Sequence, residues 1–389
     1  DLDIDSIPVR GRVTVAGEQL PDRGEDRGNL VFQRENGSAS VSVPLGASGD
    51  ATYDIALPSG TYDITYAHNP KLCEDGPSTM PCTSGVIKEG ANLSNGGNLD
   101  IDIPTVDVRG AITLDGETMP DASDNRGSVT FSRQGAESGH TISDLGETGA
   151  ATYRATLLPG TYDVAWAGNN SLCADGQPPE IPCNSGTVRN GASLKMSGTL
   201  DVDISAVKVR GAVTLDGKAL PDEEQDRGQL TFASDDGGAI TTDKFGSSGA
   251  AAYGLTLLPG TYDIQWTGNP ALCQMDPLPN VPCNSGTVRK ADLTTSGNLD
   301  IDIRAVKVRG SATLNGASIP SSVSSAGSFT FGGQAGAGAA APIELDGGAT
   351  YGITLLPGDY DISWSGDSNC DPDNLPELPC NGGTLREEQ

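Results

Sequence analysis

Eight cysteines are the residues with the clearest chemical meaning in this sequence, and they occur as four pairs. The two members of each pair lie nine or ten residues apart: Cys73/Cys82, Cys173/Cys183, Cys273/Cys283 and Cys370/Cys380. Because a unit repeated four times must pair its own cysteines, this spacing predicts four local disulfides. Such bridges indicate an oxidising compartment outside the cytosol. Closing each loop would stabilise it by about 2.7 kcal/mol through lost chain entropy.

The remaining nucleophiles and histidines favour neither an enzyme nor a zinc site. The two histidines, His68 and His140, are not repeated, and no repeat offers four zinc ligands. The sequence has no Gly-x-Ser-x-Gly motif and no glycine-rich loop ahead of a helix. We therefore predict a protein without catalytic residues.

Clustered carboxylates are the best metal candidates. Three repeats carry a loop that runs from Pro-Asp to Asp/Asn-Arg-Gly, with candidate calcium ligands at Asp22, Asp26, Asp121, Asp124, Asp222 and Asp226. Carboxylates in a glycine-turned loop suit a hard cation, but the pattern is not an EF-hand and its arginine can act as the counterion. The fourth repeat has a serine-rich segment at 321–325 instead. A calcium site and an ordinary solvated loop both stay open, and we expect no other cofactor.

Pairs of aspartates alternate with apolar residues near the end of three repeats. They are Asp100/Asp102, Asp201/Asp203 and Asp300/Asp302. Alternation with period two places each pair on the outward face of a strand. An active site is built once in a cleft, so a pair that recurs three times argues against a glycosidase dyad. We interpret these pairs as a solvated strand face, with cation binding as the alternative.

The elements that carry these residues recur four times. The sequence Val-Arg-Gly begins at Val9, Val108, Val209 and Val308, at spacings of 99, 101 and 99 residues. Within each repeat, apolar residues alternate with period two between turns such as Asp216-Gly217, which is typical of antiparallel strands. About seven such strands in 100 residues predict a β-sandwich. Aromatic residues at equivalent inward positions, Tyr66, Trp166, Trp266 and Trp364, are expected in the cores.

Two longer motifs carry a family resemblance. Val-Arg-Gly-x-Val-Thr-Leu-Asp-Gly together with Leu-Pro-Gly-Thr-Tyr-Asp-Ile resembles the carboxypeptidase regulatory-like, or prealbumin-like, immunoglobulin-type sandwiches of bacterial surface proteins. The resemblance covers all four repeats and implies a spacer or adhesive module without catalysis. The paired cysteines do not belong to that general pattern. The predicted fold class is all-β: four tandem immunoglobulin-like sandwich domains in a linear array, each with one local disulfide.

Domain boundaries follow from a change in the phase of the apolar residues. Leu99, Ile101 and Ile103 are odd-numbered, whereas Val106 and Val108 are even-numbered, and one strand cannot change face midway. We therefore predict sandwiches at residues 6–104, 105–205, 206–304 and 305–389, joined by stiff linkers of about two residues. Residues 1–5 are expected to close a preceding sandwich. The fourth sandwich is expected to lack its last strand.

This arrangement predicts assembly with copies of the same chain, head to tail. Asp1-Leu2-Asp3-Ile4 matches Asp100-Ile101-Asp102-Ile103 without a gap. We expect Leu2 and Ile4 to insert into the fourth sandwich of another copy, beside the strand that contains Leu385, by strand complementation. A segment of a longer covalent array would show the same pattern.

Composition and charge exclude several classes of protein. With 24 basic and 52 acidic residues the net charge is -28, so nucleic acid is repelled over the whole surface. The sequence has no apolar run long enough for a membrane span and begins without the pattern of a signal peptide, so we interpret it as a processed or excerpted segment. We predict an extracellular or cell-surface location and a structural role in a bacterial fibre or stalk. The alternatives are an adhesin stalk that binds glycan or calcium and the accessory part of a secreted enzyme.

Overall fold

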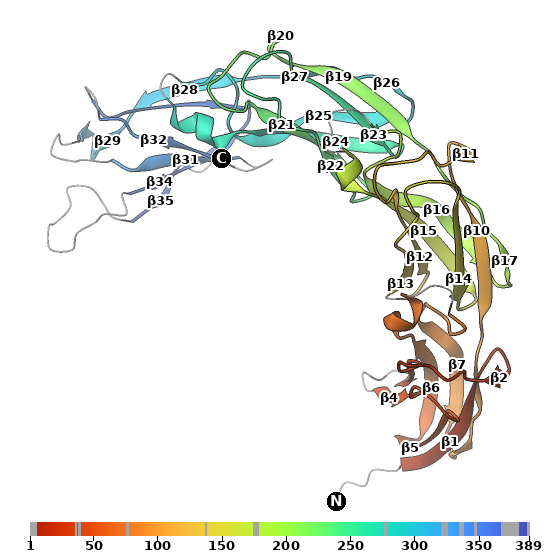
Figure 1. Cartoon of the computed structure of the whole chain (residues 1–389). Helices are drawn as coiled ribbons and strands as arrows, with labels where there is room; N and C mark the ends of the chain where they lie inside the picture. Colours follow the sequence, from red (N-terminus) through yellow and green to blue (C-terminus); the bar gives the residue numbers. More distant parts are fainter. Residues whose placement is uncertain are drawn as a thin grey trace, which may run out of the picture. The chain divides into compact units, whose positions relative to one another are not determined.

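The computed structural model is all-β, and successive repeats form sheets of the same kind (Figure 1). The structure describes residues 6–35, 37, 40–74, 78–136, 138–173, 179–275, 278–319, 326–333, 338–345, 348–366 and 381–386, without the side chains of residues 173 and 386. Leu2 and Ile4 therefore lie outside the described residues. The prediction of all-β sandwich repeats is confirmed.

Repeat 1 shows the topology that the other repeats follow. Its elements are β1 (Ser6–Val15), β2 (Glu18–Gln19), β3 (Asn29–Arg34), β4 (Ser40–Pro44), β5 (Thr52–Pro58), β6 (Gly60–Ala67), η1 (Pro70–Cys73, a 3-10 helix), β7 (Gly85–Leu93), β8 (Gly97–Asn98) and β9 (Ile101–Ile103). One sheet has the order β2-β1-β5, and β8 and β9 pair with β1 in parallel. The other sheet has the order β4-β3-β6-β7.

Repeats 2 and 3 use the same order of pairing. Repeat 2 contains β10 (Val106–Leu114), β11 (Glu117–Thr118), β12 (Gly127–Arg133), β13 (Gly139–Ile142), β14 (Ala151–Leu157), β15 (Gly160–Gly168), η2 (Asn170–Cys173), β16 (Ser185–Leu194), β17 (Gly198–Thr199) and β18 (Val202–Ile204). Repeat 3 contains β19 (Val207–Leu215), β20 (Lys218–Ala219), β21 (Gly228–Ser234), β22 (Ala239–Thr241), β23 (Ala252–Leu257), β24 (Gly260–Gly268), η3 (Pro270–Gln274), β25 (Ser285–Leu293), β26 (Gly297–Asn298) and β27 (Ile301–Ile303).

Repeat 4 keeps the second sheet and part of the first. Its strands are β28 (Val306–Ser311), β29 (Thr313–Leu314), β30 (Ala317–Ser318), β31 (Ser328–Gly333), β32 (Ala339–Pro342), β33 (Thr350–Leu355), β34 (Tyr360–Ser365) and β35 (Gly383–Arg386). The second sheet has the order β32-β31-β34-β35, while β28 pairs with β33 and β29 with β30. Among the described residues, no strand lies on β28 in the place that β9 takes on β1.

Local sequence explains the first hairpin of each repeat. Two residues, Ala16-Gly17 in repeat 1, connect Val15 to its partner Glu18. Both have positive φ, 49° and 80°, as a type I′ turn requires. The turn pairs of the other repeats are Asp115-Gly116, Asp216-Gly217 and Asn315-Gly316, also with positive φ throughout. The turn type matches the twist of the flanking strands, so these dipeptides set the register of the first strand.

Each core lies between the two sheets of its repeat. Phe32 packs against Tyr53 with ring centroids 5.5 Å apart, and Phe131/Tyr153 and Phe232/Tyr253 repeat this contact at 5.1 and 5.4 Å. Tyr66, Trp166 and Trp266 are fully buried, as the sequence predicts. Trp364 is half-buried and donates its indole N–H to Ala326 O at 3.0 Å.

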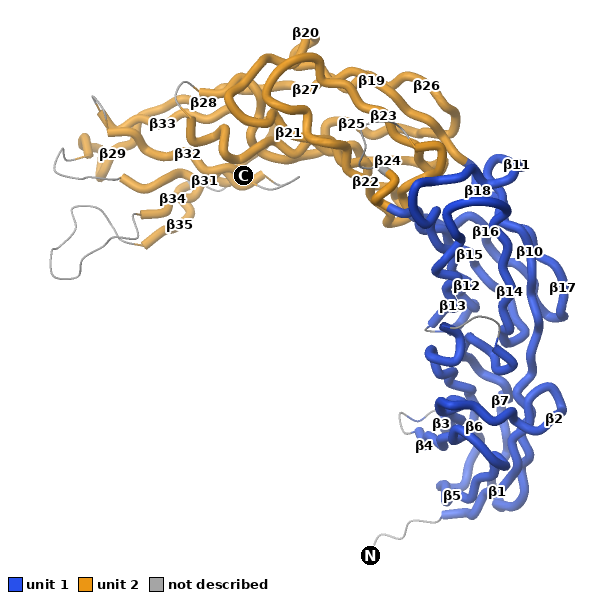
Figure 2. The backbone as a smooth tube through the Cα atoms, in the orientation of Figure 1, with its two compact units in different colours: residues 1–169, 185–205 blue, residues 170–184, 206–389 orange. Residues whose placement is uncertain are grey.

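The described chain divides into two compact units, coloured separately in Figure 2. Unit 1 comprises residues 1–169 and 185–205, and unit 2 comprises residues 170–184 and 206–389. The segment 170–184 belongs to repeat 2 by sequence, yet it is grouped with the repeat that follows it. The contacts described next explain why.

Candidate functional site: the disulfide-loop joints

A disulfide loop follows the sixth strand of each of the first three repeats. Cys73 and Cys82 form a disulfide with Cα atoms 5.8 Å apart, and Cys273 and Cys283 form another at 5.6 Å. Cys183 is disulfide-bonded as well. The side chain of Cys173, and Cys370 and Cys380 as a whole, lie outside the described residues. At the start of η1 and η3, the side chains of Asn69 and Asn269 cap the helix.

Each of these loops is hydrogen-bonded to the next repeat, and we call the contacts joints 1, 2 and 3. The amide of the second cysteine donates to a threonine carbonyl on the strand that pairs antiparallel with the first strand of the next repeat: Cys82 to Thr156 (2.8 Å), Cys183 to Thr256 (3.3 Å) and Cys283 to Thr354 (3.1 Å). The threonine hydroxyl donates back to a carbonyl of the loop: Thr156 to Ser78 (2.5 Å), Thr354 to Pro279 (2.7 Å) and Thr256 to Pro179. Backbone and side chain thus hold each loop on that strand.

The residue directly after the second cysteine forms further hydrogen bonds across each joint. In joint 3, Asn284 accepts the Leu356 amide on Oδ1 and donates from Nδ2 to the Tyr360 hydroxyl, both at 2.8 Å. That hydroxyl donates to Leu356 O at 2.7 Å. Joint 2 repeats the triangle at 2.8, 2.8 and 2.6 Å with Asn184, Leu258 and Tyr262. In joint 1, Thr83, Leu158 and Tyr162 form it at 3.1, 3.0 and 2.6 Å.

Burial keeps the tyrosines of these triangles protonated. It raises the pKa of Tyr162 and Tyr360, and it raises the pKa of Tyr262 to about 12. Each phenol can therefore donate one hydrogen bond and accept another near neutral pH. Because the triangle consists of neutral groups, salt does not screen it as it screens surface ion pairs.

Repeat 1 does not carry the residues that receive a loop of this kind. Strand register and the Tyr62–Pro58 hydrogen bond place Ala56 and Pro58 where repeat 2 has Thr156 and Leu158. Alanine lacks the hydroxyl and proline lacks the amide that form these bonds. Pro58 is also exposed, whereas Leu158, Leu258 and Leu356 are buried.

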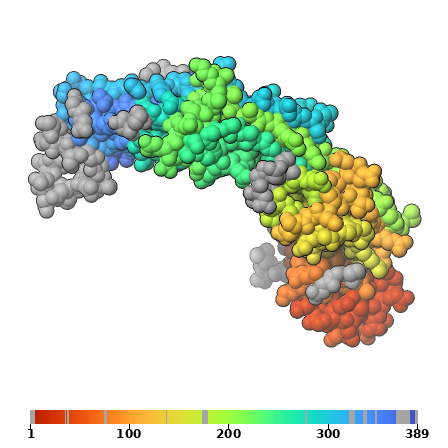
Figure 3. Space-filling view, turned by 45° about the horizontal axis from the view of Figure 1, so that its top comes forward, coloured from red at the N-terminus to blue at the C-terminus, as the bar shows by residue number. Residues whose placement is uncertain are grey.

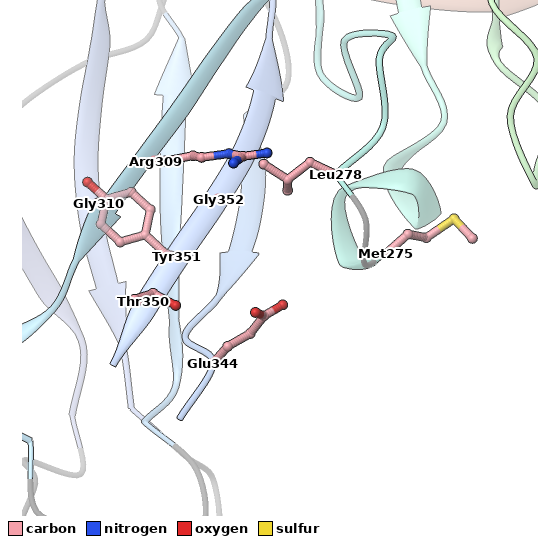
Figure 4. Close-up of a pocket in the computed structure, with 8 residues that line it drawn as sticks. All are labelled: Met275, Leu278, Arg309, Gly310, Glu344, Thr350, Tyr351 and Gly352. Atoms are coloured by element: carbon pink, nitrogen blue, oxygen red, sulfur yellow. The ribbon is translucent and has the colours of Figure 1, made fainter. Parts of the chain in front are cut away.

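Joint 3 adjoins a pocket within unit 2. This pocket, of about 470 Å³, lies between the loop after η3 and the strands β28 and β33, and Figure 4 shows Arg309 extending toward Leu278. Leu278 packs over Gly352, where a Cβ would come within 2.6 Å of its side chain. In the space-filling view the green surface of repeat 3 adjoins the blue surface of repeat 4 (Figure 3). The lining mixes apolar and charged groups.

The aspartate pairs hold the last strand of each of the first three repeats in place, a role that sequence reasoning missed. We call these last strands, β9, β18 and β27, the closing strands. Asp300 accepts the Ala212 amide at 2.9 Å, and Asp302 accepts the Thr214 hydroxyl and the Gly217 amide, both at 2.7 Å. The pairs in repeats 1 and 2 make the same bonds. These carboxylates are exposed but bonded, since they bind the edge of the first strand and the hairpin turn after it.

The closing strands also show where an inserted strand would lie. β9, β18 and β27 pair in parallel with the first strand of their own repeat. The strand equivalent to the one containing Leu385 lies in the other sheet, as β25 pairs with β24. In the described repeats the closing strand pairs with the first strand and also contacts the strand equivalent to that of Leu385, as β27 contacts β25. The expected position of Leu2 and Ile4 beside Leu385 stays a prediction.

The glycine of Val-Arg-Gly makes room for this closing segment. A Cβ on Gly11 would lie 1.9 Å from Leu99 O, and Gly110 and Gly211 face Leu200 O and Leu299 O at 2.0 and 1.9 Å. The same carbonyl accepts a tyrosine hydroxyl, as in Tyr53 to Leu99 at 2.5 Å. The motif that marks each repeat is thus explained by a close backbone approach.

The Asp-Arg-Gly loops are organised around their arginine. Arg27, Arg126 and Arg227 are fully buried. Arg227 donates to the carbonyls of Leu220, Pro221, Phe245, Gly246, Ser248 and Gly249. Arg27 and Arg126 make equivalent bonds. A guanidinium with five donors can satisfy such a ring of carbonyls without a carboxylate partner.

The calcium candidates lie around these arginines. Asp22, Asp121 and Asp222 accept the amides of Gly49, Gly149 and Gly249 at 2.8 to 2.9 Å. Asp26 accepts the Gly28 amide and Asp124 the Asn125 amide, and Asp226 occupies the position of Asp26 in repeat 3. Within the described residues, the three side chains placed closely enough to share a metal ion are Cys73, Cys82 and His140. Calcium binding at the aspartates stays a prediction.

A recurring residue pair in the sequence could have revealed the joints. Asparagine follows the second cysteine in repeats 2, 3 and 4, and Leu-Leu-Pro occurs in those same repeats but not in repeat 1. Both differences concern residues that touch across a joint. Their partners lie more than 70 positions away.

Comparisons with known proteins found no matching family model and no matching curated protein. Among solved structures, the Bacillus anthracis TIE protein aligns at 14% identity over 77% of this chain and 50% of its own length, with a TM-score of 0.18. BcpA, the major pilin subunit of Bacillus cereus, aligns at 9% identity over 77% of this chain and 99% of its own, also at 0.18. A putative cell adhesion protein from Bacteroides ovatus aligns at 8% identity over 51% and 91%, at 0.22.

The chain spans half the length of the TIE protein. At TM-scores near 0.2 these alignments carry no inference about the function of this chain. In the described part of the chain, we find no helix with the length and apolar character needed to cross a bilayer.

Proposed function

We propose that the chain is a non-enzymatic structural part of an extracellular or cell-surface fibre or stalk. The observation that carries this proposal is the repeated joint. Two residues separate the closing strand of one repeat from the first strand of the next, as between Ile103 and Val106. The disulfide loop adds a second attachment, so repeats 1 and 2 are held at two points, and so are repeats 3 and 4.

Two attachment points resist bending and rotation better than a linker alone. The loop cannot lengthen freely because its disulfide spans only nine or ten residues. Its contacts are buried: Thr83, Leu158 and Tyr162 are fully buried in joint 1. A stiff series of small domains suits a spacer that must keep its length.

Electron microscopy of the full chain tests the proposal. We expect particles with a narrow spread of angles at joints 1 and 3, each of which lies within one compact unit. Asn284→Ala should widen the spread at joint 3 and leave joint 1 unchanged. A wild-type chain as flexible as the variant would contradict the proposal.

We also propose that repeat 4 accepts a closing strand, supplied by a second copy or by the continuation of a longer covalent array. β28 has Arg309 and Gly310 at the positions of Arg10 and Gly11, which lie beside the closing segment in repeat 1. Tyr351 on β33 corresponds to Tyr53. Val306 is 44% exposed, whereas its counterparts Val106 and Val207 are 2% exposed. The segment containing Leu2 and Ile4 has the sequence of a closing strand. Its alternating aspartates match those that bind the first strand and the hairpin turn in repeats 1 to 3.

The head-to-tail contact would differ from joints 1 to 3. Because repeat 1 has Ala56 and Pro58, a disulfide loop cannot form the same bonds on it. Burial of two side chains contributes about 3–6 kcal/mol, against an association cost of about 4–15 kcal/mol. Strand pairing on β28 must therefore supply much of the affinity.

A peptide comparison tests strand insertion directly. A peptide of residues 1–5 should shift the amide resonances of β28 and raise the melting temperature of repeat 4 within the full chain. The same peptide with Ile4→Asp is the matched control and should do neither. Equal effects of both peptides, or none from the first, would contradict insertion.

A further inference from the structure

Joint 1 contains the two histidines of the chain. His140 lies on β13 and pairs with Phe131. The same register position holds Ile240 beside Phe232 in repeat 3 and Ala339 beside Phe331 in repeat 4. His140 thus replaces an apolar residue at a position that the preceding disulfide loop covers. In joint 3 this cover is seen directly, as η3 contacts β32.

The side chain of His140 is almost entirely buried. The residue is 8% exposed. Burying a polar ring costs free energy that burying an isoleucine does not. The repeated architecture does not require the histidine, because joints 2 and 3 form without it.

The buried ring faces the disulfide of the preceding repeat. A ring nitrogen of His140 and the Sγ atoms of Cys73 and Cys82 all lie within 4.8 Å of one another. Cys82 is buried and Cys73 is half-buried. The second histidine, His68, follows β6 in the same joint and has its Nδ1 2.8 Å from Ser84 Oγ.

We propose that reduction of Cys73–Cys82 turns joint 1 into a site for a soft metal ion of the zinc class. Two thiolates and the neutral imidazole of His140 form a three-ligand set that such ions prefer. A water molecule or a partner ligand would fill the fourth position. The proposal concerns joint 1 alone and goes beyond the structural role of the chain.

The chemistry balances with a dithiol as the reductant. Its thiolate attacks the half-buried Sγ of Cys73, and the thiolate of Cys82 leaves. The second thiol of the reductant then closes its own disulfide, so two electrons and two protons pass to Cys73 and Cys82. Binding of the divalent ion displaces the two thiol protons into solvent.

Cobalt(II) titration of the full chain tests the proposal, because cobalt reports thiolate ligation through a charge-transfer absorption band. After reduction with a non-chelating phosphine, we expect one equivalent to bind tightly and zinc to displace it. His140→Ile should weaken binding at least about tenfold. This variant should fold, because Ile240 occupies the same position in repeat 3. The control variant Cys273→Ser/Cys283→Ser should still bind one equivalent of cobalt.

The reciprocal variant adds a gain of function. Ile240→His places an imidazole against the disulfide loop that contains Cys183, which belongs to the same buried cluster as Ile240. We expect a second cobalt equivalent in this variant after reduction. Equal binding by wild type and His140→Ile, or no thiolate band at all, would overturn the proposal. If reduction unfolds joint 1, zinc should restore its protected amides, and failure to restore them would also overturn it.

Discussion

The backbone amide of Leu356 donates a 2.8 Å hydrogen bond to Oδ1 of Asn284, which lies 72 positions earlier in the chain. The bond crosses joint 3 and has counterparts at 2.8 Å in joint 2 and 3.1 Å in joint 1. One contact therefore defines how each described disulfide loop meets the following repeat.

Asn284→Ala should destabilise joint 3 by about 1–3 kcal/mol, because the buried Leu356 amide loses its acceptor and the half-buried Tyr360 hydroxyl loses one of its two partners. Hydrogen exchange of the Leu356 amide measures the effect, and exchange should accelerate by one to two orders of magnitude, as about 1–3 kcal/mol implies. Asn298→Ala, at an exposed position of repeat 3, is the control. Unchanged protection at Leu356 would count against the joint.

Gly211→Ala should displace the closing strand of repeat 3, since its Cβ would overlap Leu299 O. Overpacking against backbone predicts a loss of about 1–3 kcal/mol or more in the free energy of unfolding. Urea denaturation gives the value. Gly297→Ala in the same repeat meets no atom within 4 Å and should change little. Similar losses in both variants would refute the role of the close approach.

Acid should loosen the closing strand of repeat 3. Hydrogen bonds from Gly217 and Thr214 hold the pKa of Asp302 below its usual value of 3.8. The folded state thus binds the proton less readily than the unfolded state, so this contribution is complete above pH 3.8 and is lost as pH falls through the lower folded pKa. In Asp302→Asn this part of the pH dependence of unfolding should disappear. An identical acid profile for the variant would contradict it.

Arg227→Ala should cost about 3 kcal/mol, because six carbonyls lose a buried charged donor. Thermal unfolding monitored on repeat 3 measures the loss. Arg210→Ala, at an exposed position on β19, should have a small effect. Repeat 3 should still fold with this substitution, since repeat 4 has the buried Ala326 at the equivalent position.

Calcium should be dispensable for the fold. Backbone amides already bind one carboxylate oxygen each of Asp22, Asp121 and Asp222. Melting with and without a chelator should give the same temperature. A fall of many degrees on chelation would show that the aspartate loops hold the ion.

Local patterns in the sequence determined the strands, the hairpin turns and the buried aromatics. Alternation with period two decides which face of a strand is apolar, and Asp216-Gly217 needs only its own backbone to form a type I′ turn. The cysteine pairs are equally local, since nine or ten residues separate their members. These features depend on neighbours within about ten positions, and a single sequence contains that information.

Tertiary structure alone decided what the polar residues do. Asp302 has the alternation of a solvated residue, but its partner Thr214 lies 88 positions away. Arg227 looks like a surface charge until the strands around it close over its side chain. Asn284 and Tyr360 meet only after two repeats have folded and docked. Hydrogen bonds between such distant residues leave no periodic trace, because their geometry is set by how whole sheets pack and not by the chain on either side.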